Sequence, residues 1–250
     1  MIKRGTLSAA AAAALLVGCS GPSWGPLPSS PLERGDGASV FQSLFARNCA
    51  ACHGREGRGG AALSLRNPAY LAMADDGAIR KAISQGVPGT PMPAFATSAG
   101  GDLSDEQISI LVLGIRSWAD PGALAGARTP PYAASNPGSV RRGADVFSAA
   151  CASCHGLGGQ GGARAGSVVD PSFLALISDQ GLRVAVIAGR PELGAPDWRG
   201  DRPGRPLSNR EVTDVVAWLQ SRRVRYPGAP YPRPASRGFH DENNKEGVKR

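Results

Sequence analysis

The sequence predicts an all-α protein built from two small tandem helical domains. Three observations support this prediction: part of the chain is repeated, both copies end in a stretch with helical periodicity, and no stretch sustains the alternation typical of a β-strand. The 250 residues suffice for two modest domains, and 34 glycines with 21 prolines indicate that loops take a large share of each. Each apolar core is therefore expected to be small.

The repeat has an offset of 102 to 103 residues between its two copies. The residues before Cys49 resemble those before Cys151, and Asn-Pro-Ala-Tyr-Leu at 67–71 matches Asp-Pro-Ser-Phe-Leu at 170–174. Each copy is expected to end in a helix whose N-cap is Ser104 or Ser208. The apolar residues that follow these caps fit one helical face: Ile108, Leu111, Val112 and Ile115, and then Val212, Val215, Val216 and Leu219.

Composition and the repeat together predict the organisation of the chain. The expected segments are a signal peptide at 1–18, a Pro-, Ser- and Gly-rich tether at 19–36, a first domain at 37–118, a linker at 119–137, a second domain at 138–223, and a Pro-rich basic tail, expected to be disordered, at 224–250.

The N-terminus has the features of an export signal. Lys3 and Arg4 precede an apolar run at 8–17, which is shorter than the roughly 20 residues that span a bilayer. Leu-Val-Gly-Cys-Ser at 16–20 matches the bacterial lipobox, so Cys19 is expected to be lipidated; an ordinary secretory signal, with Cys19 incidental, is the alternative. We therefore expect lipid anchoring on the periplasmic side of a bacterial membrane, with inner or outer membrane left open.

The charge of the chain argues against nucleic-acid binding. The formal net charge is +8, but residues 222–250 alone contain eight basic and three acidic side chains. The folded part is therefore nearly neutral and has no basic face. The tail is expected either to be solvated or to touch anionic lipid or an acidic partner.

Each copy of the repeat carries a Cys-x-x-Cys-His motif. The first is Cys49-Ala50-Ala51-Cys52-His53, and the second is Cys151-Ala152-Ser153-Cys154-His155. This spacing is typical of c-type haem attachment, in which two thiols bond one haem and the histidine is the proximal iron ligand. Two covalent haem c groups are therefore predicted. A redox dithiol is the main alternative, but the following histidines, the duplication and the absence of a thioredoxin-like strand pattern argue against it. A structural zinc site needs four ligands.

With these motifs the chain resembles the class I cytochrome c family, in tandem diheme form, over about residues 37–118 and 138–222. The resemblance implies that a Met in a Pro-containing loop binds the iron opposite the histidine. Gly-Thr-Pro-Met-Pro-Ala-Phe at 89–95 fits this pattern, so Met92 is the implied sixth ligand of the first haem; Met73, in a helical stretch, is assigned to the core. A His/Met pair raises the reduction potential.

The second copy departs from this pattern. Ala195 stands, without a gap, where the first copy has Met92, and no methionine follows Met92 in the chain. Three hypotheses remain for the second haem: an iron that is five-coordinate or binds water, a distant ligand such as His240, or a ligand from a partner. His240 is a weak candidate, because a solvated tail residue is the simpler interpretation. Arg190, Arg199 and Arg202 near this loop are expected either to pair with haem propionates or to be solvated.

These features predict electron transfer between a membrane oxidoreductase and a periplasmic or membrane partner. The chain would be a carrier or a subunit of a respiratory or photosynthetic complex. The alternative is a diheme peroxidase-like enzyme acting at an open second haem, for which Glu192 is the nearest, weak, acid–base residue. A gas or redox sensor is a third hypothesis, without an output domain to support it.

Overall fold

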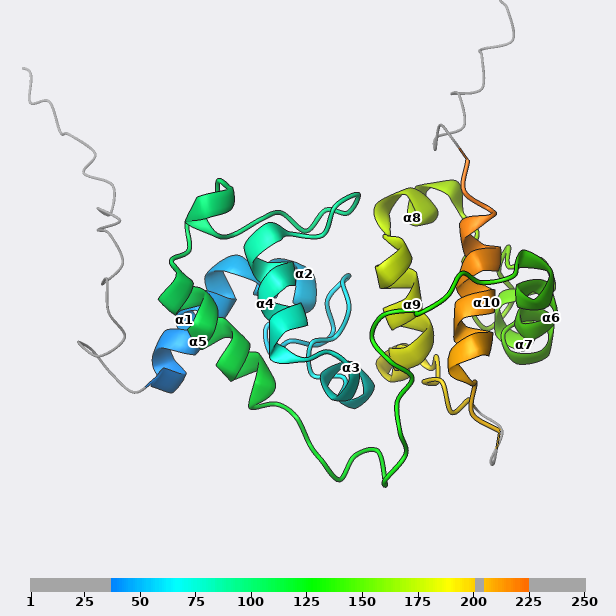
Figure 1. The fold of residues 1–250 in the computed structure, drawn as a ribbon, viewed down its shortest axis with the longest axis horizontal. Coiled ribbons are helices and arrows are strands. Elements are labelled where there is room, and N and C mark those ends of the chain that lie inside the picture. Colours follow the sequence, from blue (N-terminus) through cyan, green and yellow to red (C-terminus); the bar gives the residue numbers. More distant parts are fainter. Residues whose placement is uncertain (1–36, 201–204, 225–250) are drawn as a thin grey trace, which may run out of the picture.

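A computed structural model describes residues 37–200 and 205–224, which fold into helices joined by loops (Figure 1). The expectations on the signal peptide, Cys19, the tether, Arg202, the tail and His240 lie outside these residues. Within the described ranges there is no β-strand, and strand-like pairing is limited to two isolated bridges. The all-α prediction is confirmed.

The two copies of the repeat form two groups of helices with the same order of elements. The first group comprises α1 (Gly37–Asn48), α2 (Ala50–His53), α3 (Pro68–Met73), α4 (Asp76–Gln85), a 3₁₀ turn η1 (Thr97–Ala99) and α5 (Asp105–Arg116). The second comprises α6 (Val140–Ala150), α7 (Ala152–His155), α8 (Pro171–Leu176), α9 (Asp179–Ala188), a 3₁₀ turn η2 (Pro191–Leu193) and α10 (Asn209–Gln220).

The core of the first domain forms where α1 crosses α5. The four apolar residues predicted to share one face of α5 are all buried. Phe45 of α1 packs edge-on against Trp118, with ring centroids 5.1 Å apart, and Phe41 contacts both rings. Ser104 caps α5 in a capping box with Gln107, as its position predicted.

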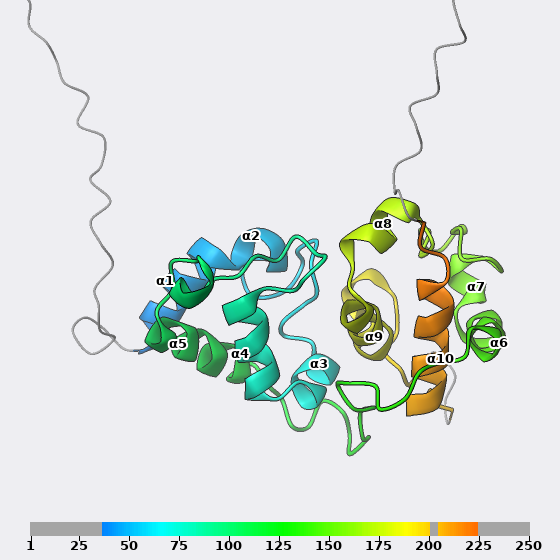
Figure 2. The same ribbon diagram turned by 45° about the horizontal axis from the view of Figure 1, so that its top comes forward.

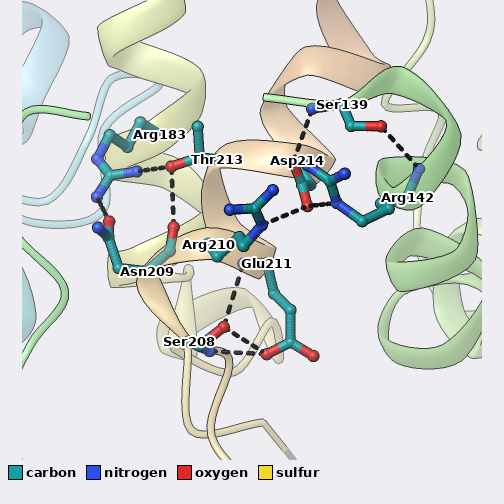
Figure 3. A network of polar contacts seen from close by, with 9 residues as sticks. All are labelled: Ser139, Arg142, Arg183, Ser208, Asn209, Arg210, Glu211, Thr213 and Asp214. Carbon is teal, nitrogen blue, oxygen red and sulfur yellow. Dashed lines mark hydrogen bonds and ion pairs between the residues drawn. The ribbon is translucent and has the colours of Figure 1, made fainter. Parts of the chain in front are cut away.

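The second domain repeats this packing with α6 against α10, which lie side by side in both views (Figures 1 and 2). The predicted apolar face of α10 is buried, and Phe147 stacks on Trp218 with centroids 4.2 Å apart. Asp214 is also buried on α10, where Arg142 of α6 and the N-cap residue Ser139 bind its carboxylate (Figure 3). Ser208 caps α10 as predicted.

The two domains share a packed interface in which α3 lies beside α9 (Figures 1 and 2). Ile187 and Ala188 of α9 are fully buried and join the same hydrophobic cluster as Ala69 and Leu71 of α3. At its centre the buried Asn67 side chain donates a hydrogen bond to the Ala188 carbonyl at 2.8 Å. Buried apolar contact therefore fixes the domains against each other.

The segment between the domains is held by α9. Arg183 is only 3% exposed and donates to the carbonyls of Pro131, at 2.7 Å, and Tyr132, at 3.1 Å. It also binds Thr213 and Asn209 of α10 (Figure 3). The guanidinium thus ties the linker to two helices of the second domain.

Candidate functional site

The Cys-x-x-Cys-His residues of each domain lie in a short helical turn that continues the first long helix. The Cys49 amide donates to the Phe45 carbonyl at 2.9 Å, and the His53 amide donates to the Cys49 carbonyl at 3.0 Å. The corresponding bonds of Cys151 and His155 measure 2.9 and 3.0 Å. Cysteines three residues apart on a helix share a face. Each motif therefore presents its two thiols together, with the histidine directly after them.

A glycine turns the chain away immediately after each histidine. Gly54 has φ of 83°, and a Cβ there would lie 1.8 Å from the Arg58 carbonyl oxygen. Only glycine tolerates both this conformation and this contact. The loop that follows can then fold back alongside the histidine.

Both histidines are held in the same way by that loop. The Nδ1 atom of His53 lies 2.7 Å from the Leu63 carbonyl oxygen, and that of His155 lies 2.9 Å from the Gly166 carbonyl oxygen. A carbonyl only accepts, so Nδ1 carries a proton, and in the neutral tautomer this leaves the Nε2 lone pair for a metal. Burial lowers the pKa of His53, against the effect of the Leu63 hydrogen bond. Burial therefore favours the neutral form of the His53 ring, which is the form that binds iron.

The four thiols are not in disulfides. Burial, with a smaller contribution from the neighbouring thiol, raises the pKa of both Cys49 and Cys151 to about 11. A redox dithiol has the opposite property, a lowered pKa. No three His, Cys, Asp or Glu side chains in the described part of the chain are grouped to hold a metal ion. The residues thus fit covalent haem, and they fit neither zinc nor disulfide exchange.

The loop that contains Met92 is closed by its own hydrogen bonds. The Val87 amide donates to the Met92 carbonyl at 3.1 Å, and the Thr90 hydroxyl donates to Val87 and accepts from the Met92 amide. The Met92 side chain is partly buried and packs against the first domain's core, as does Met73 in α3. Met92 is therefore held in a defined loop, whereas Met73 lies in α3 and packs, partly buried, against the core.

The equivalent loop of the second domain contains Ala195 and is closed more tightly. Arg190 and Ala195 exchange two backbone hydrogen bonds, each 3.0 Å long. The Arg190 side chain pairs with Glu192 at 2.5 Å and donates to the Gly60 carbonyl of the first domain at 3.0 Å. This interdomain contact was missed by sequence reasoning, because 130 residues separate its partners.

Arg199 also has a partner within the protein. It pairs with Asp197 at 2.7 Å and lies over the Trp198 ring, 5.3 Å from the centroid. Whether Arg190 and Arg199 also pair with haem propionates stays a prediction. Their guanidinium groups bind carboxylates two residues away in the chain.

Two helical domains, each with a Cys-x-x-Cys-His turn and a histidine whose Nε2 is free for iron, define a c-type cytochrome with one haem c in each domain. The family model described as "Cytochrome C oxidase, cbb3-type, subunit III" matches this chain twice, at residues 36–113 and 138–219. The chain belongs to this family.

Two relatives illustrate the similarity. The Cbb3-type cytochrome c oxidase subunit CcoP of Azospirillum sp. (strain B510) is 32% identical over 136 residues, which cover 50% of this chain and 41% of that protein. The Cytochrome bc1 complex cytochrome c subunit of Mycobacterium tuberculosis (strain ATCC 25618 / H37Rv) is 26% identical over 195 residues, covering 75% and 64%. The chain thus spans less than two thirds of either relative.

Among solved structures, the Kuenenia stuttgartiensis reducing HAO-like protein complex matches with a TM-score of 0.45 and 19% identity, over 74% of this chain and 96% of that chain. None of the helices within residues 37–200 and 205–224 combines the length and apolar character needed to cross a bilayer.

Proposed function

We propose that this chain is a diheme electron-transfer cytochrome. One haem c is bonded to Cys49 and Cys52, with His53 and Met92 as iron ligands. The other is bonded to Cys151 and Cys154, with His155 as proximal ligand. The observation that carries this proposal is the duplicated Cys-x-x-Cys-His turn, in which a backbone carbonyl fixes each histidine through Nδ1.

Bound haem iron supplies a one-electron couple, and the residues of the chain tune and hold it. The carbonyl bonds of Leu63 and Gly166 fix the ring orientation of the two histidines and increase their basicity. Met92 raises the potential of the first haem relative to a site without a thioether. The packed α3–α9 interface holds the domains in one arrangement, which favours transfer between them.

The proposed partners are redox proteins in or near a membrane respiratory complex. Both relatives are named as subunits of such complexes. We also propose that residues 37–118 and 138–223 are the two cytochrome domains, and that lipid on Cys19 attaches the protein to the periplasmic side of a membrane. A peroxidase-like activity is not favoured, since the carboxylate of Glu192 is bound by Arg190 at 2.5 Å.

The test is to count covalent haems and locate them. The full-length holoprotein is expected to carry two haems by pyridine haemochrome assay and intact mass, and to show two redox transitions. Replacing Cys49 and Cys52 by Ala, or Cys151 and Cys154 by Ala, should each remove one haem and one transition. If the intact mass of the wild-type protein equalled that of the polypeptide alone, the proposal would be contradicted.

A further inference from the structure

We propose that the second domain binds a small uncharged diatomic ligand, of the class of carbon monoxide and nitric oxide, at the iron position for which Ala195 supplies no side chain. This inference rests on the proposed attachment of haem at Cys151 and Cys154, with His155 as the proximal ligand. It concerns the loop at 189–196, which has Ala195 where its first-domain counterpart has Met92.

The backbones of the two loops match where each loop begins and where it returns to the end of its helix. Gly86 and Gly189 end α4 and α9 with φ of 66° and 63°. A Cβ on Gly86 would lie 2.7 Å from the Met92 carbonyl oxygen, and one on Gly189 would lie 2.8 Å from that of Ala195. The next amide in each loop donates to that same carbonyl, at 3.1 and 3.0 Å. Ala195 therefore occupies the place of Met92, and the ligand is lost by substitution.

The loop is fixed in this register. The Ala195 amide returns a hydrogen bond to the Arg190 carbonyl at 3.0 Å, and Gly194 closes the 3₁₀ turn in the left-handed conformation, with φ of 84°. The Arg190 side chain anchors the loop to the carbonyls of Gly60 and Ala61 in the first domain. A shift by one residue would break all of these bonds, so no neighbour replaces Ala195.

The second domain offers no substitute ligand from elsewhere. Residues 138–224 contain no methionine, lysine or tyrosine, and their one histidine is His155. The two carboxylates that flank Ala195 are both held by arginines, Glu192 at 2.5 Å and Asp197 at 2.7 Å. Within residues 189–200, these are the carboxylates that could otherwise have bound iron.

The same pairing indicates the charge of the ligand. The guanidinium groups of Arg190 and Arg199 are each paired with a carboxylate, so neither presents an unpaired positive charge that would attract an anion. The Ala195 methyl group is smaller than a methionine side chain and donates no hydrogen bond. The site therefore suits a small uncharged ligand, and carbon monoxide is the appropriate probe for reduced haem.

The experiment is a carbon monoxide titration of the reduced, full-length holoprotein, followed by absorbance and compared with the covalent haem count. One carbon monoxide per two haems is expected. Ala195→Met should raise the apparent Kd for carbon monoxide at least roughly tenfold, because the thioether would compete for the same position. Met92→Ala, the matched change in the first domain, should give a second binding site. Two covalent haems that bind no carbon monoxide would overturn the inference.

Electron paramagnetic resonance of the oxidised protein tests the remaining ligand hypothesis. We expect one low-spin and one high-spin haem, both unchanged in His240→Ala. Two low-spin haems in the wild type, one of which becomes high-spin in His240→Ala, would assign the ligand to the tail and overturn the inference. A haem count below two would instead contradict the proposed function.

Discussion

At the scale of single residues, Asn67 and Asp170 show how equivalent positions take different roles. Both are helix N-caps: the Asn67 side chain accepts from the Tyr70 amide at 3.1 Å, and Asp170 accepts from the Phe173 amide at 3.0 Å. Asn67 is 4% exposed and donates through its amide nitrogen to Ala188, whereas Asp170 is exposed. Capping the helix requires only the side-chain oxygen, whereas the interdomain hydrogen bond to Ala188 also requires the side-chain nitrogen of Asn67.

Exchanging the two cap residues is therefore expected to have unequal effects. Asn67→Asp keeps the cap but places a carboxylate oxygen against the Ala188 carbonyl, which should lower the free energy of unfolding by about 1–3 kcal/mol. Asp170→Asn, the reverse change at the exposed cap, should alter it by less than about 0.5 kcal/mol. Urea unfolding of both variants provides the measurement. Equal losses would show that the cap alone matters.

Asp214 gives the second domain a pH-dependent contribution to stability. Its carboxylate is 2% exposed and accepts from Arg142 Nε at 2.7 Å and from the Ser139 amide at 2.7 Å (Figure 3). These bonds, those of Arg142 most, lower the pKa of Asp214, although burial opposes them. The folded-state pKa thus lies below the unfolded value of about 3.9, so the stabilisation is present above that pH and is lost as the pH falls through the folded-state pKa.

We expect Asp214→Asn to lower the free energy of unfolding at pH 7 by about 1–3 kcal/mol. The difference from wild type should shrink below about pH 4, as the wild-type carboxyl takes up its proton. Urea unfolding between neutral and acidic pH measures this difference. Asp145→Asn on the exposed side of α6 is the control, and a difference for Asp214→Asn that grows on acidification would refute the assignment.

At the scale of elements, both domains end in a helix with the same start. Ser104 and Ser208 each accept from the amide three residues later, and Gln107 and Glu211 each return a bond to the cap amide. Two otherwise unsatisfied amides are bound at each start. The Ser208 amide lowers the pKa of Glu211, so this box persists in moderately acidic solution.

Ser104→Ala and Ser208→Ala should each lower the free energy of unfolding by about 1 kcal/mol, and the corresponding Gly variants by only a few tenths. The reason is that alanine offers no acceptor, whereas glycine leaves the amides open to water. The two sites lie in different domains, so the double alanine variant should lose about the sum. Chemical denaturation of the set measures this. If the glycine variants had a lower free energy of unfolding than the alanine variants, the loss of backbone entropy would outweigh the loss of the cap.

At the scale of the whole molecule, the local features were predictable from the sequence and the contacts between domains were not. The caps Ser104 and Ser208 and the apolar faces of α5 and α10 depend on spacings within one helix, which the sequence displays directly. The bond from Asn67 to Ala188 joins residues 121 positions apart, and nothing near either residue signals it. The position of Ala195 was predictable because the repeat aligns without a gap, but the fixing of its loop by Arg190 was not.

The linker is the clearest case of tertiary structure overriding a local pattern. Its composition predicts a linker without specific contacts, yet Arg183 donates to the carbonyls of Pro131 and Tyr132. The Arg183 side chain is buried, and this burial lowers its pKa. All the hydrogen-bond acceptors found for this guanidinium in the described structure are neutral oxygens, including those of Thr213 and Asn209. Its charge is therefore solvated by the linker and α10 in place of water.

Arg183→Met should release the linker while preserving most of the buried volume. We expect faster limited proteolysis within residues 119–137 and a loss of about 1–3 kcal/mol in the free energy of unfolding, since the Pro131 carbonyl loses the Arg183 donor and the Tyr132 carbonyl keeps only the bond from Gln180. Arg164→Met, at an exposed arginine, is the matched control and should change neither. If the Arg183 variant were as resistant as wild type, apolar packing of α3 on α9 would by itself hold the linker in place, and the guanidinium would serve only to fill space between α9 and α10.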